Sequence, residues 1–108
     1  MMLNLDESMT DWVEKYGDGF VRSLRAAAEV RAERRKSYGD TYRNDYLMFL
    51  YYQMNNKIKR FKSQIAFDGN SEYVKDVSVA VDSLLDLICY AAFAFENTMA
   101  KELNDDVR

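Results

Sequence analysis

The sequence contains no proline and no histidine, and it has one cysteine and four glycines among 108 residues. Without proline, nothing forbids long helices, and apolar residues recur at three- and four-residue intervals over long stretches, which favours an all-α fold. Without histidine, the chain lacks a histidine general base and the ligands of a Cys/His zinc site. The single Cys89 lies in an apolar stretch, so we expect a buried thiol and not a disulfide.

An excess of positive charge is also missing. Fifteen basic residues face eighteen acidic ones, for a net charge of −3, which disfavours a general nucleic-acid binder. No apolar run approaches the roughly 20 residues of a membrane span. The acidic N-terminus lacks a basic-then-apolar signal pattern, so a cytoplasmic location is expected. Hydrophobic residues nevertheless make up 48% of the chain, enough for a one-domain core and for a subunit interface.

Turn signals divide the chain into a short N-terminal helix, a basic helix and two long helices. The predicted helices span residues 1–16, 20–36, 43–66 and 72–103. Gly17-Asp18-Gly19 breaks the first, and Asp40 or Thr41 is expected to cap the third. The Asp68–Ser71 turn is short, with Asn70 or Ser71 as the next cap. The last two helices are therefore predicted to form a long antiparallel hairpin.

The stretch from 81 to 95 is nearly all apolar, yet it carries Asp82 and Asp86. A carboxylate buried alone is costly, so these side chains need water, a cation or a metal. The predicted hairpin brings Lys57 and Arg60 towards them. Two interpretations stay open: a structural cluster of ion pairs, or a site in which these groups handle a charged ligand.

Three cations, Arg34-Arg35-Lys36, end the basic helix just before a turn. They are compatible with a solvated helix face, because the helix dipole favours cations at this end. The alternative, which the sequence favours less, is a rim that faces phosphate. Two segments, 46–52 and 91–95, are apolar around their whole circumference. One hairpin and a small helix cannot cover both, so a homodimer or tetramer is predicted.

Three segments carry a family resemblance: K-S-Y-G-D-T-Y at 36–42, N-N-K-I-K-R-F-K-S at 55–63, and V-K-D-V-S-V-A-V-D-S-L-L-D-L-I-C-Y-A at 74–91. Their order resembles the nucleotide modification associated domain 1 family of phage genomes, a relative of MazG-type all-α nucleotide pyrophosphohydrolases. The resemblance covers residues 35–99 and implies a MazG-like oligomeric bundle. It implies ligand-binding roles for Lys36, Tyr38, Gly39, Tyr42, Lys57, Arg60 and Tyr90, and Mg²⁺-binding roles for Asp82 and Asp86.

The chain departs from this family pattern where carboxylates are expected. Asn55 and Asn56 replace an acidic pair, Val77 replaces a glutamate, and Cys89 replaces an asparagine. Because Mg²⁺ prefers several charged oxygen ligands, a weak site at most is expected at Asp82 and Asp86.

Three functions follow as hypotheses. The first is a nucleotide-binding protein that needs no cofactor and does not hydrolyse its ligand, so that in a phage setting it sequesters a nucleotide or a nucleotide second messenger. The second is a Mg²⁺-dependent nucleoside triphosphate pyrophosphohydrolase of the MazG type. The third is a structural or interaction protein. None of them involves a membrane or a nucleic acid as partner.

Overall fold

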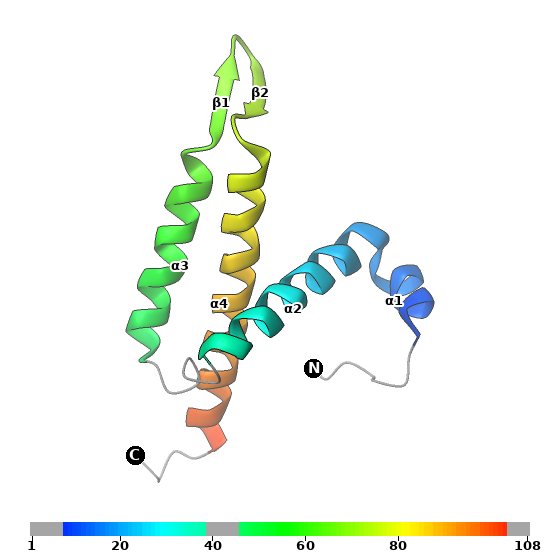
Figure 1. Cartoon of the computed structure of the whole chain (residues 1–108), viewed down its shortest axis with the longest axis vertical. Coiled ribbons are helices and arrows are strands. Elements are labelled where there is room, and N and C mark those ends of the chain that lie inside the picture. Colours follow the sequence, from blue (N-terminus) through cyan, green and yellow to red (C-terminus); the bar gives the residue numbers. More distant parts are fainter. Residues whose placement is uncertain (1–7, 39–45, 104–108) are drawn as a thin grey trace.

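Four helices and a small two-stranded sheet make up the computed structural model, which describes residues 8–38 and 46–103. The elements are α1 (Met9–Tyr16), α2 (Asp18–Tyr38), α3 (Leu47–Lys62), β1 (Ile65–Asp68), β2 (Ser71–Val74) and α4 (Val77–Leu103). In Figure 1, α3 and α4 lie side by side and antiparallel, α2 crosses α4 obliquely, and α1 packs against α2. The predicted all-α class is thus confirmed in its main outline.

A capped helix and a single glycine form the N-terminal part of the described chain. Ser8 and Asp11 form a capping box, in which each side chain accepts a hydrogen bond from the backbone N–H of the other residue. Gly17, with a φ of 91°, alone separates α1 from α2. The break predicted over three residues therefore occupies one, and Asp18 already belongs to the next helix.

The turn at residues 68–71 is the tip of a β-hairpin and does not join two helices directly. The two strands pair in antiparallel register, from Ile65 opposite Val74 to Asp68 opposite Ser71. Gly69 has a φ of 63° and Asn70 does not have a positive φ, as in the type II′ turn that suits two-residue hairpins. The inner ends of the predicted helices 43–66 and 72–103 are therefore wrong: α3 ends at Lys62 and α4 begins at Val77.

Asp76 caps α4, and the sequence-based choice of Asn70 or Ser71 is wrong because both lie in the hairpin. Its Oδ1 accepts hydrogen bonds from the backbone N–H groups of Ser78 at 3.0 Å and Val79 at 3.3 Å, and from the Ser78 hydroxyl at 2.7 Å. These hydrogen bonds, the one from the hydroxyl above all, lower the pKa of Asp76 below its ordinary 3.8. The cap expected at Asp40 or Thr41 lies outside the described residues.

The hydrophobic core lies where α2 crosses the hairpin of α3 and α4. Its buried members are Ala27, Leu50, Cys89, Tyr90 and Phe93. The Cys89 thiol donates a hydrogen bond to the Ala27 carbonyl oxygen at 3.3 Å, and burial raises the pKa of this thiol. The expectation of a buried thiol is therefore confirmed. This small core leaves much of α4 uncovered.

Within the described chain, α4 is the one helix long and apolar enough to cross a membrane. This criterion is weak, because the core helix of a soluble protein also meets it. Only 33% of its most apolar stretch is buried, however, so α4 is not an ordinary core helix either. The cytoplasmic location stays a prediction.

Candidate functional site

Asp86 is the buried charge around which the candidate site is built. It lies on the core-facing stripe of α4, whose other buried members are Ala80, Ser83, Cys89, Tyr90, Phe93 and Asn97. Only 2% of Asp86 is exposed. Because an unpaired carboxylate at such a position would be costly, its partners decide whether it is tolerated.

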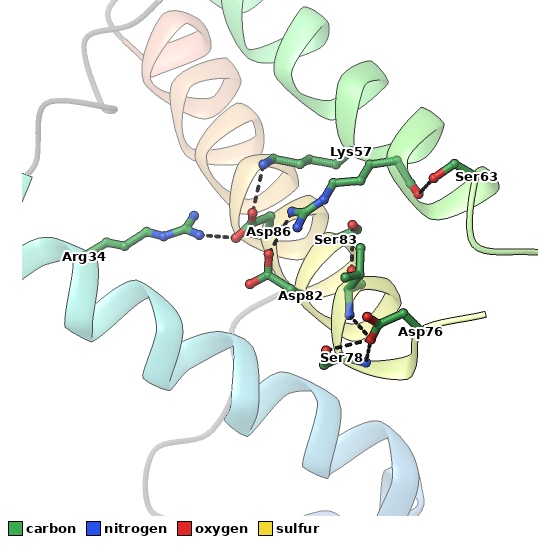
Figure 2. Close-up of polar contacts among 10 residues, drawn as sticks. Arg34, Lys57, Ser63, Asp76, Ser78, Asp82, Ser83 and Asp86 are labelled. Atoms are coloured by element: carbon green, nitrogen blue, oxygen red, sulfur yellow. Dashed lines mark hydrogen bonds and ion pairs between the residues drawn. The ribbon is translucent and has the colours of Figure 1, made fainter. Parts of the chain in front are cut away.

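Two cations from two helices hold this carboxylate. Lys57 of α3 places its Nζ 2.9 Å from Oδ2 of Asp86, and the Arg34 guanidinium of α2 contacts Oδ1. Figure 2 shows the two side chains converging on Asp86 from different helices. Both cations keep contact with water, since 32% of the Arg34 side chain and 21% of the Lys57 side chain are exposed. With two cations, Arg34 and Lys57, and one carboxylate, Asp86, this cluster carries a net charge of +1.

A second ion pair lies one helical turn away, nearer the surface. Arg60 Nη1 of α3 is 2.8 Å from Oδ2 of Asp82 on α4, and both side chains are about half exposed. Because α3 and α4 are antiparallel, the cation that comes first in the sequence pairs with the carboxylate that comes last. Lys57 therefore pairs with Asp86, and Arg60 with Asp82. The predicted approach of these four side chains is confirmed.

Arg34 was not predicted to contact either carboxylate, since the sequence placed it in a surface rim. The contact arises because α2 crosses α4 (Figure 1), which brings the Arg34 guanidinium to Asp86. Partial burial opposes the charged form of Arg34, but the attraction of Asp86 is stronger in sum and raises the pKa of Arg34. One turn earlier, Arg31 adds a second link to α4: its Nη2 is 2.9 Å from Oε2 of Glu96, and its guanidinium lies 4.7 Å from the Phe93 ring centroid.

The carboxylates predicted as a weak Mg²⁺ site are both engaged by these cations. Across residues 8–38 and 46–103, no group of three or more His, Cys, Asp or Glu side chains is placed to hold a metal ion. Asn55 and Asn56, which stand where the resemblance leads one to expect carboxylates, are half-buried and exposed, respectively, on α3. Mg²⁺ binding at Asp82 and Asp86 stays a prediction.

Lys36, predicted to bind a ligand, lies on the outer face of α2. Its Nζ is 3.3 Å from a carboxylate oxygen of Glu33, and both side chains are about three-quarters exposed. Lys36 also lines an open groove of about 450 Å³, whose other lining residues are Ala28, Arg31, Ala32 and Arg35 of the same helix. The three cations give this groove a basic character.

The remaining residues predicted to bind a ligand are three tyrosines and one glycine, and the structure describes two of them. Tyr90 is 9% exposed in the core, with its ring centroid 6.3 Å from that of Phe93 in an edge-on arrangement, and this position favours a packing role. Tyr38 is the last residue of α2. Gly39 and Tyr42 lie outside the described residues.

Comparison of the chain with models of protein families, with curated proteins and with solved structures finds no match.

Proposed function

We propose that this protein binds the phosphates of a nucleotide at the cations Arg34, Lys57 and Arg60, and that binding requires no Mg²⁺. The observation that carries the proposal is the arrangement around Asp86. Two cations share a single buried carboxylate while keeping part of their surface in water. A second anion could neutralise the remaining charge of this cluster.

The donor capacity of the two side chains supports the proposal. A guanidinium carries five N–H donors and an ammonium carries three, and a single carboxylate cannot accept all of them. Each charge-assisted hydrogen bond to phosphate contributes roughly 1.5–3 kcal/mol. Two or three such bonds, together with stacking of the base on a tyrosine, would give micromolar binding after association costs.

A tyrosine supplies the aromatic ring for the base in this proposal. Tyr46, immediately before α3, is 83% exposed and can stack on a base, which contributes roughly 1–3 kcal/mol. A protein that holds a nucleotide in this way without cleaving it would sequester it. The resemblance to a phage family gives this outcome a biological setting: capture of a nucleotide or of a nucleotide second messenger.

A structural role is the second candidate, and one observation favours it. The cations already pair with Asp86 and Asp82, and they tie α2 and α3 to α4. Ion pairs of this kind can be purely structural, with no role other than making a buried carboxylate tolerable. Ligand binding and structural pairing predict different responses to nucleotides, so one experiment separates them.

The test is calorimetric titration with a panel of nucleoside mono-, di- and triphosphates and cyclic dinucleotides, once in EDTA and once in Mg²⁺. Binding of at least one nucleotide in EDTA is the expected result. Lys57→Gln should weaken it at least tenfold, while Lys62→Gln, which changes an exposed cation on the same helix, should leave it unchanged. Circular dichroism checks that both variants fold.

Three outcomes would reject the proposal. Loss of binding in EDTA would make the metal essential. Steady release of pyrophosphate or phosphate in Mg²⁺, abolished by Asp82→Asn or Asp86→Asn, would identify a pyrophosphohydrolase. Absence of binding to every nucleotide would favour the structural role.

A further inference from the structure

The β-hairpin projects beyond the ends of α3 and α4, and its second strand is open to solvent (Figure 1). All four residues of β2 are exposed, whereas β1 begins with two half-buried residues, Ile65 and Ala66. In the described chain, no further strand pairs with either of the two. A two-stranded hairpin is only marginally stable in water, and a third strand normally adds the missing stability. The outer edge of β2 is therefore available for such a strand.

The hydrogen-bond pattern identifies the backbone groups of β2 that point outwards. At the base of the hairpin, the N–H of Lys75 donates to the Gln64 carbonyl oxygen at 2.8 Å. In an antiparallel pair, hydrogen-bonded residues alternate with residues whose N–H and C=O groups point away from the partner strand. Tyr73, two residues before Lys75, is therefore hydrogen-bonded to β1. The N–H and C=O groups of Val74 and Glu72 point to the open edge.

Three exposed lysines lie at the base of the hairpin. Lys59 and Lys62 are near the end of α3, and Lys75 directly follows β2. The hydrogen bond between Lys75 and Gln64 brings the two sides of the base together. Within residues 8–38 and 46–103, none of the three lysines has an ion-pair partner, and the neighbouring Asp76 caps α4. The base of the hairpin therefore has an excess of positive charge.

The charge changes sign towards the tip. Glu72 is exposed, and Asp68 of β1 lies next to the turn. Between the charged ends, Tyr73 and Val74 are 50% and 40% exposed. A strand that complements this edge carries opposite charges at its two ends and aromatic or β-branched residues between them, because such pairs stabilise a sheet when they lie directly opposite. A nucleic acid or an anionic membrane fits less well, since the acidic tip repels it.

We infer that the edge of β2 accepts an extended segment of another protein as a third, antiparallel strand. From the base to the tip of the hairpin, this segment carries an acidic residue, two apolar residues and a basic residue. They lie opposite Lys75, Val74, Tyr73 and Glu72, respectively. Acidic residues that precede the segment would face the lysines at the end of α3. The inference does not depend on the nucleotide proposal, because none of these residues contacts Asp86.

The test uses a fluorescent peptide that contains Glu-Glu-Ile-Val-Lys. Its anisotropy should rise to saturation with the full-length protein at concentrations below about 500 µM. N-methylation of the isoleucine, which lies opposite Val74, should abolish binding, because the N–H of this residue points to β2. N-methylation of the valine opposite Tyr73 is the matched control. The N–H of this valine points away from β2, so binding should be unchanged.

Variants of the protein test the same edge from the other side. Val74→Pro removes an outward N–H but no hydrogen bond to β1, so it should abolish binding. Lys75→Glu should weaken binding about fivefold, and a peptide with lysine opposite this position should restore it. Arg25→Glu, at an exposed position on α2, should change nothing. A nuclear Overhauser effect between the Cα protons of Phe67 and Glu72, which lie opposite each other, verifies that each variant keeps the hairpin.

Absence of binding to the wild-type protein would overturn the inference, as would equal binding of the two N-methylated peptides. The edge of β2 could also pair with β2 of a second copy, so the molar masses of the wild-type and Val74→Pro proteins are compared by light scattering. They should be equal, and an oligomer lost in Val74→Pro would assign the edge to a second copy and reject the inference. Binding of oligo-dT that Lys75→Glu abolishes would assign the lysines to phosphate and also reject it.

Discussion

At the residue scale, Asp86 determines how the three long helices meet. It is a buried carboxylate on the core-facing side of the most apolar helix in the described chain, and its two cations come from the other two long helices. Removing the carboxylate leaves Arg34 and Lys57 close together without their shared anion. Each then loses its partner and repels the other, so the variant loses more than one interaction.

We predict that Asp86→Ala lowers the free energy of unfolding by about 2–4 kcal/mol. This is somewhat less than the roughly 3–5 kcal/mol typical of a fully buried pair, because both cations can turn towards water. Asp86→Asn should cost less, since the amide keeps the shape and one acceptor oxygen. Urea denaturation at a fixed protein concentration measures all variants.

Asp82→Ala is the matched control for this prediction. Asp82 lies one turn earlier on the same helix and pairs with Arg60, but about half of each side chain is exposed. Its removal should therefore cost less than about 1 kcal/mol. Equal losses for Asp82→Ala and Asp86→Ala would show that burial does not set the cost, and an unchanged Asp86→Ala would contradict the prediction outright.

The sequence could predict part of this site because two of its ion pairs join the two helices of one hairpin. Once α3 and α4 pack as an antiparallel hairpin, helical spacing places Lys57 and Arg60 opposite Asp86 and Asp82. The contact of Arg34 with Asp86 depends on the angle at which α2 crosses the hairpin. That angle results from packing at Ala27, Cys89 and Phe93, which no local pattern encodes.

At the element scale, the β-hairpin shows where helical periodicity misleads. Apolar residues on both sides of the turn continue the spacing of the helices, and this suggested two helices joined directly. The β-hairpin signal was present as Gly69-Asn70 between short runs containing Ile65, Phe67 and Tyr73. Over four residues, turn chemistry decides the structure, because helical periodicity needs a longer stretch to be distinctive.

We predict opposite effects for two glycine-to-alanine substitutions. Gly69 has a φ of 63° in the hairpin turn, and no neighbouring atom lies within 4 Å of an added Cβ, so Gly69→Ala should cost about 1–2 kcal/mol through the backbone alone. Gly19 lies within α2 without a positive φ and with equal space, so Gly19→Ala should stabilise by up to about 1 kcal/mol. Urea denaturation of both variants is the measurement, and a stabilising Gly69→Ala would argue against the hairpin.

We predict that Asp76 makes the stability of α4 dependent on acid pH. Its folded-state pKa lies below the ordinary value of 3.8, so the carboxylate stabilises the fold above that value. This contribution is lost as the pH falls through the folded-state pKa. Asp76→Ala should lower the Tm at pH 7, and the difference from wild type should shrink towards pH 2. A difference that is constant with pH would show that the charge of Asp76 is not involved.

At the scale of the whole molecule, the described helices form an open arrangement. In Figure 1, α2 extends from its crossing with α4 away from the hairpin of α3 and α4, and α1 lies at its far end. The sequence predicted an apolar excess, because its composition could be counted. It could not say which helix faces remain uncovered, because that depends on how α2 divides the surface of α4 between core and exterior.

If a second copy covers these faces, folding and association are coupled, and we predict that the Tm rises with protein concentration. Because subunits dissociate as they unfold, mass action stabilises the native dimer, and an increase from about 1 to about 100 µM should raise the Tm by several degrees. Leu84→Asp, at a 37% exposed apolar position on α4, should remove this dependence and show one low Tm at every concentration, while Phe67→Asp, at a 66% exposed position on the β-hairpin, should keep it. Scanning calorimetry or circular dichroism melts over this range make the measurement. A wild-type Tm that is independent of concentration would mean that each chain folds by itself, and the exposed apolar side chains of α4 would then play no part in stability.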